Sequence, residues 1–286
     1  MTDNNKTTFS LEYFPPRSAK GEEGLAVARA DLKLLNPAYV SVTFGAGGST
    51  QDGTYATIKS IMENDGVDAA PHISCISTDR ETLARMLGEY RELGVKRLVA
   101  LRGDLPSGYG TTEAAELRYA SDLVAFIREQ TGDWFKIEVA AYPEFHPQAR
   151  SAQDDLENFK RKAEAGADSA ITQYFFNPDA YFRFIDSCTA MGIDIPVVPG
   201  IMPITNYKQL ARFSDACGAE IPRWIRKRLE GYGDDLTSIR DFGFDVVFTM
   251  CERLLDAGAP GLHFYSMNRT EPTRGLWKAL NLGQQI

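Results

Sequence analysis

Residues 136–175 read KIEVAAYPEFHPQARSAQDDLENFKRKAEAGADSAITQYF and contain one complete β/α unit. The apolar run Lys136–Ala141 is typical of a buried strand, Tyr142–Arg150 is polar, and Ala152–Ala165 has helical periodicity. Gly166 then provides a residue that readily takes the left-handed conformation at a helix end, and another apolar run follows shortly. This order predicts a strand, a long loop, a helix, a tight turn and a second strand parallel to the first.

The same order of elements repeats along the whole chain. Eight apolar, β-rich runs predict strands at Phe9–Phe14, Tyr39–Phe44, Ala69–Cys75, Arg97–Leu101, Lys136–Ala141, Ser169–Phe175, Pro196–Ile201 and Gly261–Ser266. Helices are predicted at Glu22–Leu35, Thr50–Asn64, Arg80–Leu93, Ala114–Gln130, Ala152–Ala165, Pro178–Met191 and Asn206–Cys217, with further helix from Pro222 to Ala257. Because no linker interrupts this alternation, we predict one domain over residues 1–286, an α/β fold that closes as a (β/α)8 TIM barrel rather than a doubly wound open sheet.

The turns at the two ends of the predicted strands differ. Helices end at Gly94, Gly166, Gly192 and Gly258, each close to the next strand, so the turns from helix to strand are tight. The segments from strand to helix are longer and more polar. Active sites of β/α barrels lie at the carboxyl ends of the strands, so we expect the functional residues in those longer segments.

Composition limits the possible partners and compartments. A formal charge of −8 and a pI near 5.1, with no block of Lys and Arg, disfavour nucleic acid and anionic membranes as partners. The chain has no apolar run long enough for a membrane span or a signal peptide, which predicts a cytoplasmic protein. Cys75, Cys188, Cys217 and Cys251 are scattered, so we expect neither a disulfide nor a zinc site.

Glu12 is a carboxyl group among apolar and aromatic neighbours in the first predicted strand, FSLEYFPPR at Phe9–Arg17. Side chains alternate along a strand, so Ser10, Glu12 and Phe14 share a face, which in a barrel is the interior. A partly desolvated carboxyl keeps its proton more readily than a solvated one, as a general acid working near neutrality requires. The same residues equally allow an ion pair between Glu12 and Arg17 or another barrel arginine.

Two loops offer groups that can contact a ligand. Arg102-Gly103-Asp104 follows the fourth strand with a cation, an approachable backbone and a carboxylate; alternatively, it is a turn in which Arg102 pairs with Asp104. Gly45–Gly48 lies between a strand and a helix but lacks the full spacing of a dinucleotide-binding turn. We interpret it as a flexible active-site loop.

The helix after the fifth strand carries a polar strip. Asp155, Asn158 and Lys162 are spaced i, i+3 and i+7 and therefore share one face, with Arg161 close to it. Such a strip suits the ribose and pyrophosphate of a dinucleotide. The alternative is a solvated helix face with weak ion pairs.

Four more polar residues lie in or after predicted strands. His72 and His263 are either polar groups at the barrel end or satisfied core histidines, and neither has a nearby nucleophile that would suggest a triad. Gln173 is an amide in an otherwise apolar strand, where it needs partners or supplies them to a heterocycle. Arg269 follows the last strand, in a position to meet a carboxylate.

Eight motifs, taken in order, resemble the methylenetetrahydrofolate reductase family over nearly the whole chain. They are LEYFPPR (Leu11–Arg17), VSVTFGAGG (Val40–Gly48), APHISC (Ala70–Cys75), ALRGDLP (Ala100–Pro106), YASDLV (Tyr119–Val124), AAYPEFHP (Ala140–Pro147), AITQYFF (Ala170–Phe176) and HFYSMNR (His263–Arg269). Each motif is weak alone, but their shared order is specific.

The resemblance implies that FAD lies across the carboxyl ends of the strands. The implied FAD contacts are Thr43, Phe44, Ala46, His72, Arg102, Gly103, Asp104, Ala120, Tyr142, His146 and Ala149, with Asp155, Asn158, Arg161 and Lys162 at the ribose, diphosphate and adenine. It also implies that Gln173 hydrogen-bonds the folate pterin, that Tyr207 places an aromatic ring beside the substrate, and that Arg269 is a substrate-side arginine.

The implied activity is reduction of 5,10-methylenetetrahydrofolate to 5-methyltetrahydrofolate with NAD(P)H as hydride donor. Glu12 would be the general acid that assists opening of the imidazolidine ring to an iminium. Asp104 would lie near the flavin pyrimidine and the pterin, where its charge favours a cationic substrate and disfavours an anionic reduced flavin. Nicotinamide and folate would use one flavin face in turn, with ping-pong kinetics. NADH and a homo-oligomer are expected by analogy with bacterial relatives.

Other functions are compatible with the residues. Another flavin barrel oxidoreductase, such as a proline dehydrogenase-like enzyme, is one, and a relative that transfers hydride without flavin is another. A folate-binding or methyltransferase barrel would bind folate without oxidising a nicotinamide. The chain ends shortly after the predicted barrel, so we expect no regulatory domain and no feedback by adenosylmethionine; Gly45–Gly53 resembles the family only loosely.

Overall fold

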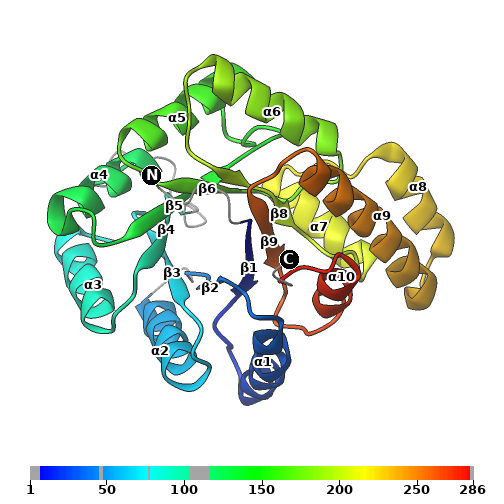
Figure 1. The fold of residues 1–286 in the computed structure, drawn as a ribbon, viewed down its shortest axis with the longest axis horizontal. Helices are drawn as coiled ribbons and strands as arrows, with labels where there is room; N and C mark the ends of the chain where they lie inside the picture. The colour runs from blue at the N-terminus through cyan, green and yellow to red at the C-terminus, as the bar shows by residue number, and fades with distance from the viewer. Residues whose placement is uncertain (1–6, 45–47, 77, 104–115, 284–286) are drawn as a thin grey trace.

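A ring of parallel strands surrounded by helices forms the molecule (Figure 1). The computed structural model describes residues 7–44, 48–76, 78–103 and 116–283. The strands are β1 (Thr8–Tyr13), β2 (Tyr39–Val42), β3 (Ala69–Ser74), β4 (Arg97–Leu101), β5 (Lys136–Ala141), β6 (Ser169–Thr172), β7 (Val197–Val198), β8 (Gly200–Ile201) and β9 (Gly261–Tyr265). The predicted α/β barrel is therefore confirmed.

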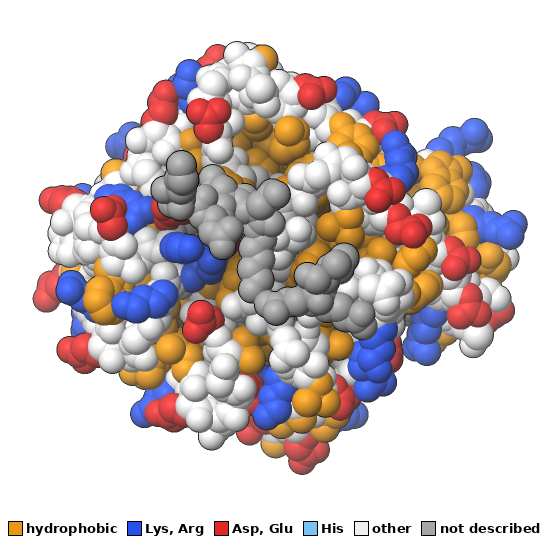
Figure 2. Space-filling view, in the orientation of Figure 1, with side chains coloured by type: hydrophobic (Ala, Val, Ile, Leu, Met, Phe, Trp, Pro, Cys, Tyr) orange, Lys and Arg blue, Asp and Glu red, His pale blue; other side chains and the backbone are white. Residues whose placement is uncertain are grey.

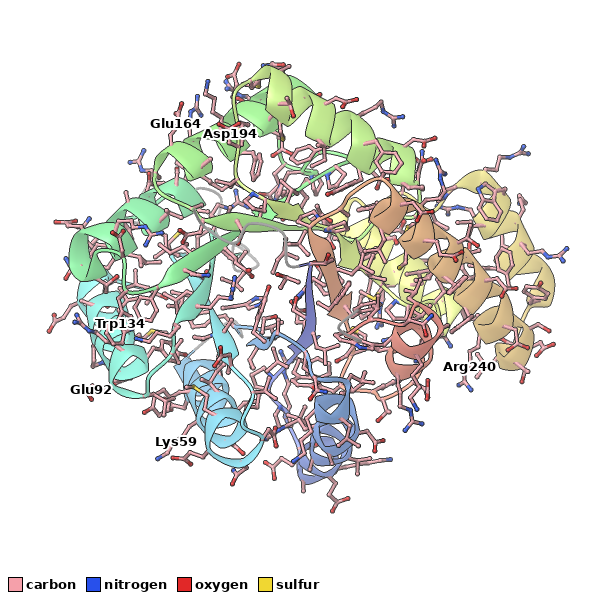
Figure 3. The ribbon with its side chains drawn as sticks, in the orientation of Figure 1. Lys59, Glu92, Trp134, Glu164, Asp194 and Arg240 are labelled. Carbon is pink, nitrogen blue, oxygen red and sulfur yellow. The ribbon has the colours of Figure 1, made fainter. Side chains whose placement is uncertain are left out.

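The helices lie outside the ring (Figure 1). They are α1 (Ala19–Leu32), the 3-10 turn η1 (Lys33–Leu35), α2 (Gly48–Asn64), α3 (Arg80–Glu92), α4 (Ala120–Thr131), α5 (Ala152–Glu164), α6 (Pro178–Ala190), α7 (Tyr207–Cys217), α8 (Arg223–Tyr232), α9 (Leu236–Asp256) and α10 (Thr273–Ala279). Figure 3 shows polar side chains such as Lys59, Glu164 and Arg240 on the outer rim of this layer.

The ring closes through a strand that is interrupted at one residue. The sheet order is β7-β6-β5-β4-β3-β2-β1-β9-β8, and only Pro199 separates β7 from β8 in the chain. Proline has no backbone N–H for the ladder, whereas its carbonyl still accepts a hydrogen bond from the His263 N–H at 2.9 Å. The predicted strand Pro196–Ile201 is thus one strand that pairs first with β6 and then with β9.

The two faces of the strands differ in composition. Outward-facing residues such as Leu11, Val40 and Ile73 pack against the helices in one large apolar cluster. Inside the ring, the apolar cluster contains only Tyr39, Ala70, Val99 and Ile171, with Leu101 against it. Burial of the outer face supplies the hydrophobic stabilisation of the barrel, and polar side chains occupy much of the interior.

Several predicted boundaries change in the structure. Strand β6 ends at Thr172, so Gln173 lies just beyond it rather than within it. Strand β1 ends at Tyr13, and Phe14 is 40% exposed instead of facing the interior. The long segment predicted as helix after Pro222 is two helices, α8 and α9, because Gly233 has a φ of +58° that ends the first of them.

The glycines predicted to end helices do so. Gly94, Gly166, Gly192 and Gly258 have φ values of +87°, +110°, +69° and +85°. The short helix α10 was not predicted, because its 7 residues are too few to show a recognisable helical period. All four cysteines are free thiols. Within the described residues, the structure contains no helix of the length and hydropathy that a bilayer crossing requires, and no cluster of three or more His, Cys, Asp or Glu arranged to hold a metal ion.

Candidate active site

The carboxyl group of Glu12 lies between two histidine rings inside the barrel. Its Oε2 atom is 3.4 Å from Nε2 of His72 on β3 and 3.7 Å from Nε2 of His263 on β9. Neither Nε2 atom has a hydrogen-bond partner among the described residues, although both are buried. Within the described chain the Glu12 carboxyl has ion-pair contacts only with these histidines, so the alternative pairing with Arg17 is not found.

Burial disfavours the charged forms of two groups beside Glu12, His72 and Tyr265. Desolvation lowers the pKa of His72 below its ordinary value, against an opposing attraction from Glu12. Tyr265, which pairs with Glu12 across β1 and β9, has its pKa raised by burial and then by the Glu12 charge. The Tyr265 hydroxyl donates to the Thr172 carbonyl at 2.7 Å, so its proton is directed to the backbone.

A second polar group lies deeper in the barrel and was missed by the sequence reasoning. Glu138, only 2% exposed, accepts from the Arg97 guanidinium and from the Tyr39 hydroxyl, both at 2.6 Å. Ser10 on β1 contacts one of the two histidines beside Glu12, because its Oγ lies 2.8 Å from Nδ1 of His263. The sequence contains a weak signal for Glu138, an acid in an otherwise apolar strand.

The loop after β4 is tied to β3. The Ser74 hydroxyl and the Ile76 N–H donate to the Arg102 carbonyl at 2.8 and 2.9 Å. Gly103 has a φ of +88°, and a Cβ there would lie 2.0 Å from Ser74 Oγ, so only glycine fits. The Arg102 guanidinium donates to its neighbour's carbonyl at 3.3 Å and to the Gln148 side chain. Arg102 and Gly103 are therefore held at a strand end, as predicted.

Two predicted residues, Ala46 and Asp104, lie outside the described residues. Thr43 and Phe44, which lie shortly before Ala46 in the chain, follow β2 and are half-buried. The Thr43 N–H donates to the Tyr13 carbonyl at 3.0 Å, and its own carbonyl accepts from Thr54 at 2.9 Å. Ala120, half-buried, is the first residue of α4.

The loop after β5 is folded against the start of α5. The rings of Tyr142 and His146 meet edge to face at 4.6 Å, and the His146 N–H donates to the Asp155 carboxylate at 2.9 Å. His146 Nδ1 accepts from the Gln148 N–H at 3.0 Å, and its carbonyl accepts from the Ala149 N–H at 2.9 Å. Asp155 thus organises the loop from the helix.

Lys162 is a partly buried cation on the same helix. Its ammonium donates to the Ala140 carbonyl at the end of β5 and has no ion-pair partner within 4.0 Å in the described chain. Desolvation lowers its pKa to about 8, opposed by a weaker attraction from Asp155. Arg161 is exposed and donates to the Asn158 side chain at 2.7 Å. The polar strip of Asp155, Asn158, Arg161 and Lys162 on α5 is thus only partly exposed to solvent.

The three residues expected on the substrate side have different surroundings. Gln173 is half-buried, and its Oε1 accepts from the Tyr174 N–H at 3.0 Å. The Tyr207 hydroxyl donates to Glu230 on α8 at 3.2 Å, and its pKa is raised by burial and by that carboxylate. Arg269 is exposed in the segment after β9.

Hydrogen bonds from two side chains to the backbone hold the end of β1, where Glu12 lies. The Ser266 hydroxyl donates to the Glu12 carbonyl at 2.6 Å. The Asn268 amide pairs with the Phe14 backbone, accepting from its N–H at 3.0 Å and donating to its carbonyl at 2.8 Å. Asn268 has a φ of +54°, which asparagine tolerates better than most residues. Neither Ser266 nor Asn268 was singled out in the sequence.

Figure 2 shows the face of Figure 1 with its side chains. Apolar groups gather above and to the right of the centre, on the side where Figure 1 places β6 and β8. Charged side chains lie mostly toward the rim of this view. An apolar surround with a few fixed polar groups is the usual composition of a small-molecule site.

The sequence of the chain matches the family model described as methylenetetrahydrofolate reductase over residues 1–281. The chain belongs to the methylenetetrahydrofolate reductase family. Proteins named 5,10-methylenetetrahydrofolate reductase are similar throughout: that of Pectobacterium carotovorum is 44% identical over 97% of this chain and 91% of its own length. Those of Salmonella typhimurium and Escherichia coli are 42% and 41% identical over 96% of this chain and 90% of theirs.

Solved structures with the same fold are more distant in sequence than these reductases. A Clostridium thermocellum protein described as binding two copies of 5-methyl-5,6,7,8-tetrahydrofolic acid has a TM-score of 0.66 and 15% identity, covering 97% of this chain and 96% of its own. The C-terminal domain of a chitinase-like protein from Desulfitobacterium hafniense has a TM-score of 0.58 and 14% identity, with coverages of 97% and 99%. Both likenesses concern the barrel fold alone.

Proposed function

We propose that this chain reduces 5,10-methylenetetrahydrofolate to 5-methyltetrahydrofolate, with NADH as the hydride donor, FAD as the bound carrier and Glu12 as the general acid. Membership of the reductase family supports the folate reaction. The observation that carries the acid role is the half-buried Glu12 carboxyl between two unpartnered imidazole nitrogens near the end of β1.

The residues fit an anionic dinucleotide such as FAD. Lys162 is a desolvated ammonium without an ion pair in the described chain, an arrangement that an anionic ligand stabilises. His72 provides a buried Nε2 atom with no hydrogen-bond partner among the described residues, and Arg102 provides a guanidinium after β4. With Asn158 and Arg161 on α5, these donors would hold the diphosphate and ribose, and Tyr142 and His146 would line the site beside them.

Bound FAD would supply the hydride-transfer chemistry between the nicotinamide and the folate. The chain itself supplies the proton. Glu12 protonates the folate nitrogen N10 as its bond to the one-carbon unit breaks, which leaves a cationic iminium on N5. The hydride then adds to that carbon and gives the methyl group. One proton and one hydride are consumed, and NADH becomes NAD⁺.

The remaining site residues would bind and orient the folate. The Gln173 amide nitrogen is free of the Tyr174 contact that its oxygen makes, and it would donate to the pterin. Tyr207 would present its ring to the substrate while its hydroxyl is held by Glu230. Arg269, an exposed cation, would meet a carboxylate. Asp104, outside the described residues, would favour the cationic iminium through its charge.

The folate described for the Clostridium thermocellum barrel adds support, because the same fold there holds the product class that we propose here. Family membership favours the redox reaction over simple folate binding. The partly buried Lys162 ammonium, which has no ion pair in the described chain, supports a cofactor that carries a diphosphate and so favours the redox reaction.

An anaerobic stopped-flow experiment tests the proposal. Protein loaded with FAD is mixed with NADH, and the flavin absorbance near 450 nm is expected to fall, on the order of milliseconds to seconds for typical enzymes. A second mixing with 5,10-methylenetetrahydrofolate is expected to restore the absorbance and to form 5-methyltetrahydrofolate. Failure to retain FAD would refute the cofactor assignment. Folate binding without NADH oxidation would refute the redox reaction and favour a binding protein.

A further inference from the structure

A tight turn follows β9 and ends at Arg269. It begins at Ser266, whose carbonyl accepts from the Arg269 N–H at 3.0 Å. The two central residues, Met267 and Asn268, both have a φ of +54°. Asparagine adopts this left-handed conformation more readily than most residues, whereas methionine rarely does. The backbone at Met267 is therefore strained, and such strain persists only where surrounding contacts hold it.

Two side chains of this turn hold it against the end of β1. The Ser266 hydroxyl donates to the Glu12 carbonyl at 2.6 Å and accepts from the Asn268 N–H at 3.3 Å. The Asn268 amide accepts from the Phe14 N–H at 3.0 Å and donates to the Phe14 carbonyl at 2.8 Å. Met267 packs against the outer apolar cluster. The strained turn is thus held by β1 and by the apolar layer together.

The Asn268 side chain continues the pairing of β1 beyond the end of the β1–β9 ladder. The last pair of that ladder is Glu12 with Tyr265, the residue at which β9 ends. Beyond it, one side-chain amide bonds to both backbone groups of Phe14, as the backbone of a neighbouring strand would. The turn therefore holds the backbone of β1 at Glu12 and again at Phe14.

We propose that Ser266 and Asn268 are positioning residues that hold this turn on β1, so that Glu12 and Arg269 keep one fixed arrangement for the folate. Both roles rest on the proposed function, in which Glu12 is the acid and Arg269 is a substrate-side residue. Ser266 and Asn268 act on those two residues through the backbone.

The structure of the substrate gives a reason for linking Glu12 to Arg269. In a folate, N10 is joined to the glutamate carboxylates through a rigid benzoyl group. The nitrogen that receives the proton and the carboxylate that meets a cation are therefore held apart by the substrate itself. A misplacement of about 1 Å at a reacting centre can slow a reaction about 10²-fold. An acid and a cation tied to one turn match the spacing of such a substrate better than two that move independently.

Asn268→Gly separates the amide of this side chain from its backbone conformation. Asparagine is common in left-handed turns for its conformation alone, and glycine takes a positive φ even more readily, so the turn is kept while the amide is lost. Hydrogen exchange of the Phe14 N–H in the FAD-loaded protein is expected to be about fivefold faster in the variant than in wild type. Unchanged exchange would overturn the proposal, because the amide would then not hold the end of β1.

Asn36→Gly is the matched control. Asn36 also has a left-handed backbone, with a φ of +51°, but it ends η1 shortly before β2 begins, away from the carboxyl ends of the strands. The exchange of the Phe14 N–H and both half-reactions should remain as in wild type. A loss of activity as large as that of Asn268→Gly would assign the effect to left-handed asparagines in general and count against the proposal.

Kinetics of the FAD-loaded enzyme test the functional consequence. At saturating folate, Asn268→Gly is expected to slow the folate half-reaction about tenfold, while flavin reduction by NADH stays within about twofold of wild type. Equal slowing of both half-reactions would indicate a general structural loss and overturn the proposal. Ser266→Ala removes the hydroxyl that is bonded to the Glu12 carbonyl, and it provides the same test if Asn268→Gly folds poorly. A wild-type folate rate in Ser266→Ala would contradict the proposal.

Two double-mutant cycles show through which residues Asn268 acts. In the Glu12→Gln background, Asn268→Gly should slow the remaining folate reaction by less than about twofold, because no acid is left to position. In the Arg269→Gln background it should no longer raise the folate concentration that gives half the maximal rate. Additive effects in either cycle would overturn the proposal and leave the proposed function intact. Normal folate turnover in Glu12→Gln would instead refute the acid role itself.

Discussion

Neighbouring residues of β1 belong to two different environments. Leu11 is fully buried and faces the helices, whereas Glu12 faces the barrel interior with a side chain 18% exposed. The outer environment is a continuous apolar cluster that stabilises the fold through hydrophobic burial. The inner one combines a small apolar cluster with Ser10, Tyr39 and two buried histidines.

This difference shows that the outer face of the strands stabilises the barrel, whereas the inner face carries the polar groups available for chemistry. A buried polar group is costly unless it is paired, so each inner side chain needs a specific partner, whereas an outer side chain needs only a complementary shape. Glu138 is hydrogen-bonded to Arg97 and Tyr39, whereas the two histidine nitrogens that face Glu12 have no hydrogen-bond partner in the part of the chain that the structure describes. The unpaired groups therefore mark the reacting part of the interior.

The largest expected effect follows from removing the acid on the inner face. Glu12→Gln keeps the shape of the side chain but has no proton to donate, so the folate half-reaction should slow by roughly 10²- to 10⁴-fold. Reduction of bound flavin by NADH should persist, and the two half-reactions are measured separately by anaerobic stopped flow. Glu164→Gln, on the outer rim (Figure 3), is the matched control and should leave both rates as in wild type.

The adjacent outward residue should show the opposite behaviour. Leu11→Ala leaves a cavity in the outer cluster and should lower the free energy of unfolding by about 2–5 kcal/mol. Denaturant unfolding of the protein measures this loss. Leu34→Ala, at a side chain 73% exposed, should change stability by less than about 0.5 kcal/mol. Equal losses of unfolding free energy in the two variants would contradict the conclusion that the buried outer cluster, and not the exposed surface, stabilises the fold.

The smallest expected effect is on FAD affinity and concerns the charge of Lys162. Without ligand the pKa of Lys162 is lowered to about 8, and a bound diphosphate favours the charged form. FAD affinity should therefore be full below pH 8 and fall as the pH rises through that value, by about tenfold between pH 7 and pH 9.

Equilibrium titration of apoprotein with FAD checks this pH dependence. Lys162→Met should bind FAD weakly and with little variation over the same pH range. Lys160→Met is the matched control on the same helix, where the lysine pairs with Glu164 at 3.8 Å, and it should retain the wild-type curve. A pH-independent affinity in the wild-type protein would show that the ammonium does not meet the diphosphate.

Local patterns were sufficient to predict most of the fold. Apolar runs marked every strand position, and glycines such as Gly94 and Gly258 marked helix ends, because periodicity and left-handed backbone are encoded within a few residues. The break at Pro199 and the short helix α10 escaped prediction. Both depend on how the ring closes and on what packs against it, which no short window of sequence contains.

The sequence by itself determined the α/β barrel, the position of Glu12 inside it and the family resemblance that the comparisons confirm. Only the tertiary structure decided which groups surround the acid. His72 and His263 are separated from Glu12 by 60 and 251 positions in the chain, and Glu138 and Arg97 come from two further strands. Their meeting depends on strand register around a closed ring, because hydrogen bonds between parallel neighbours fix the height at which each side chain enters the interior.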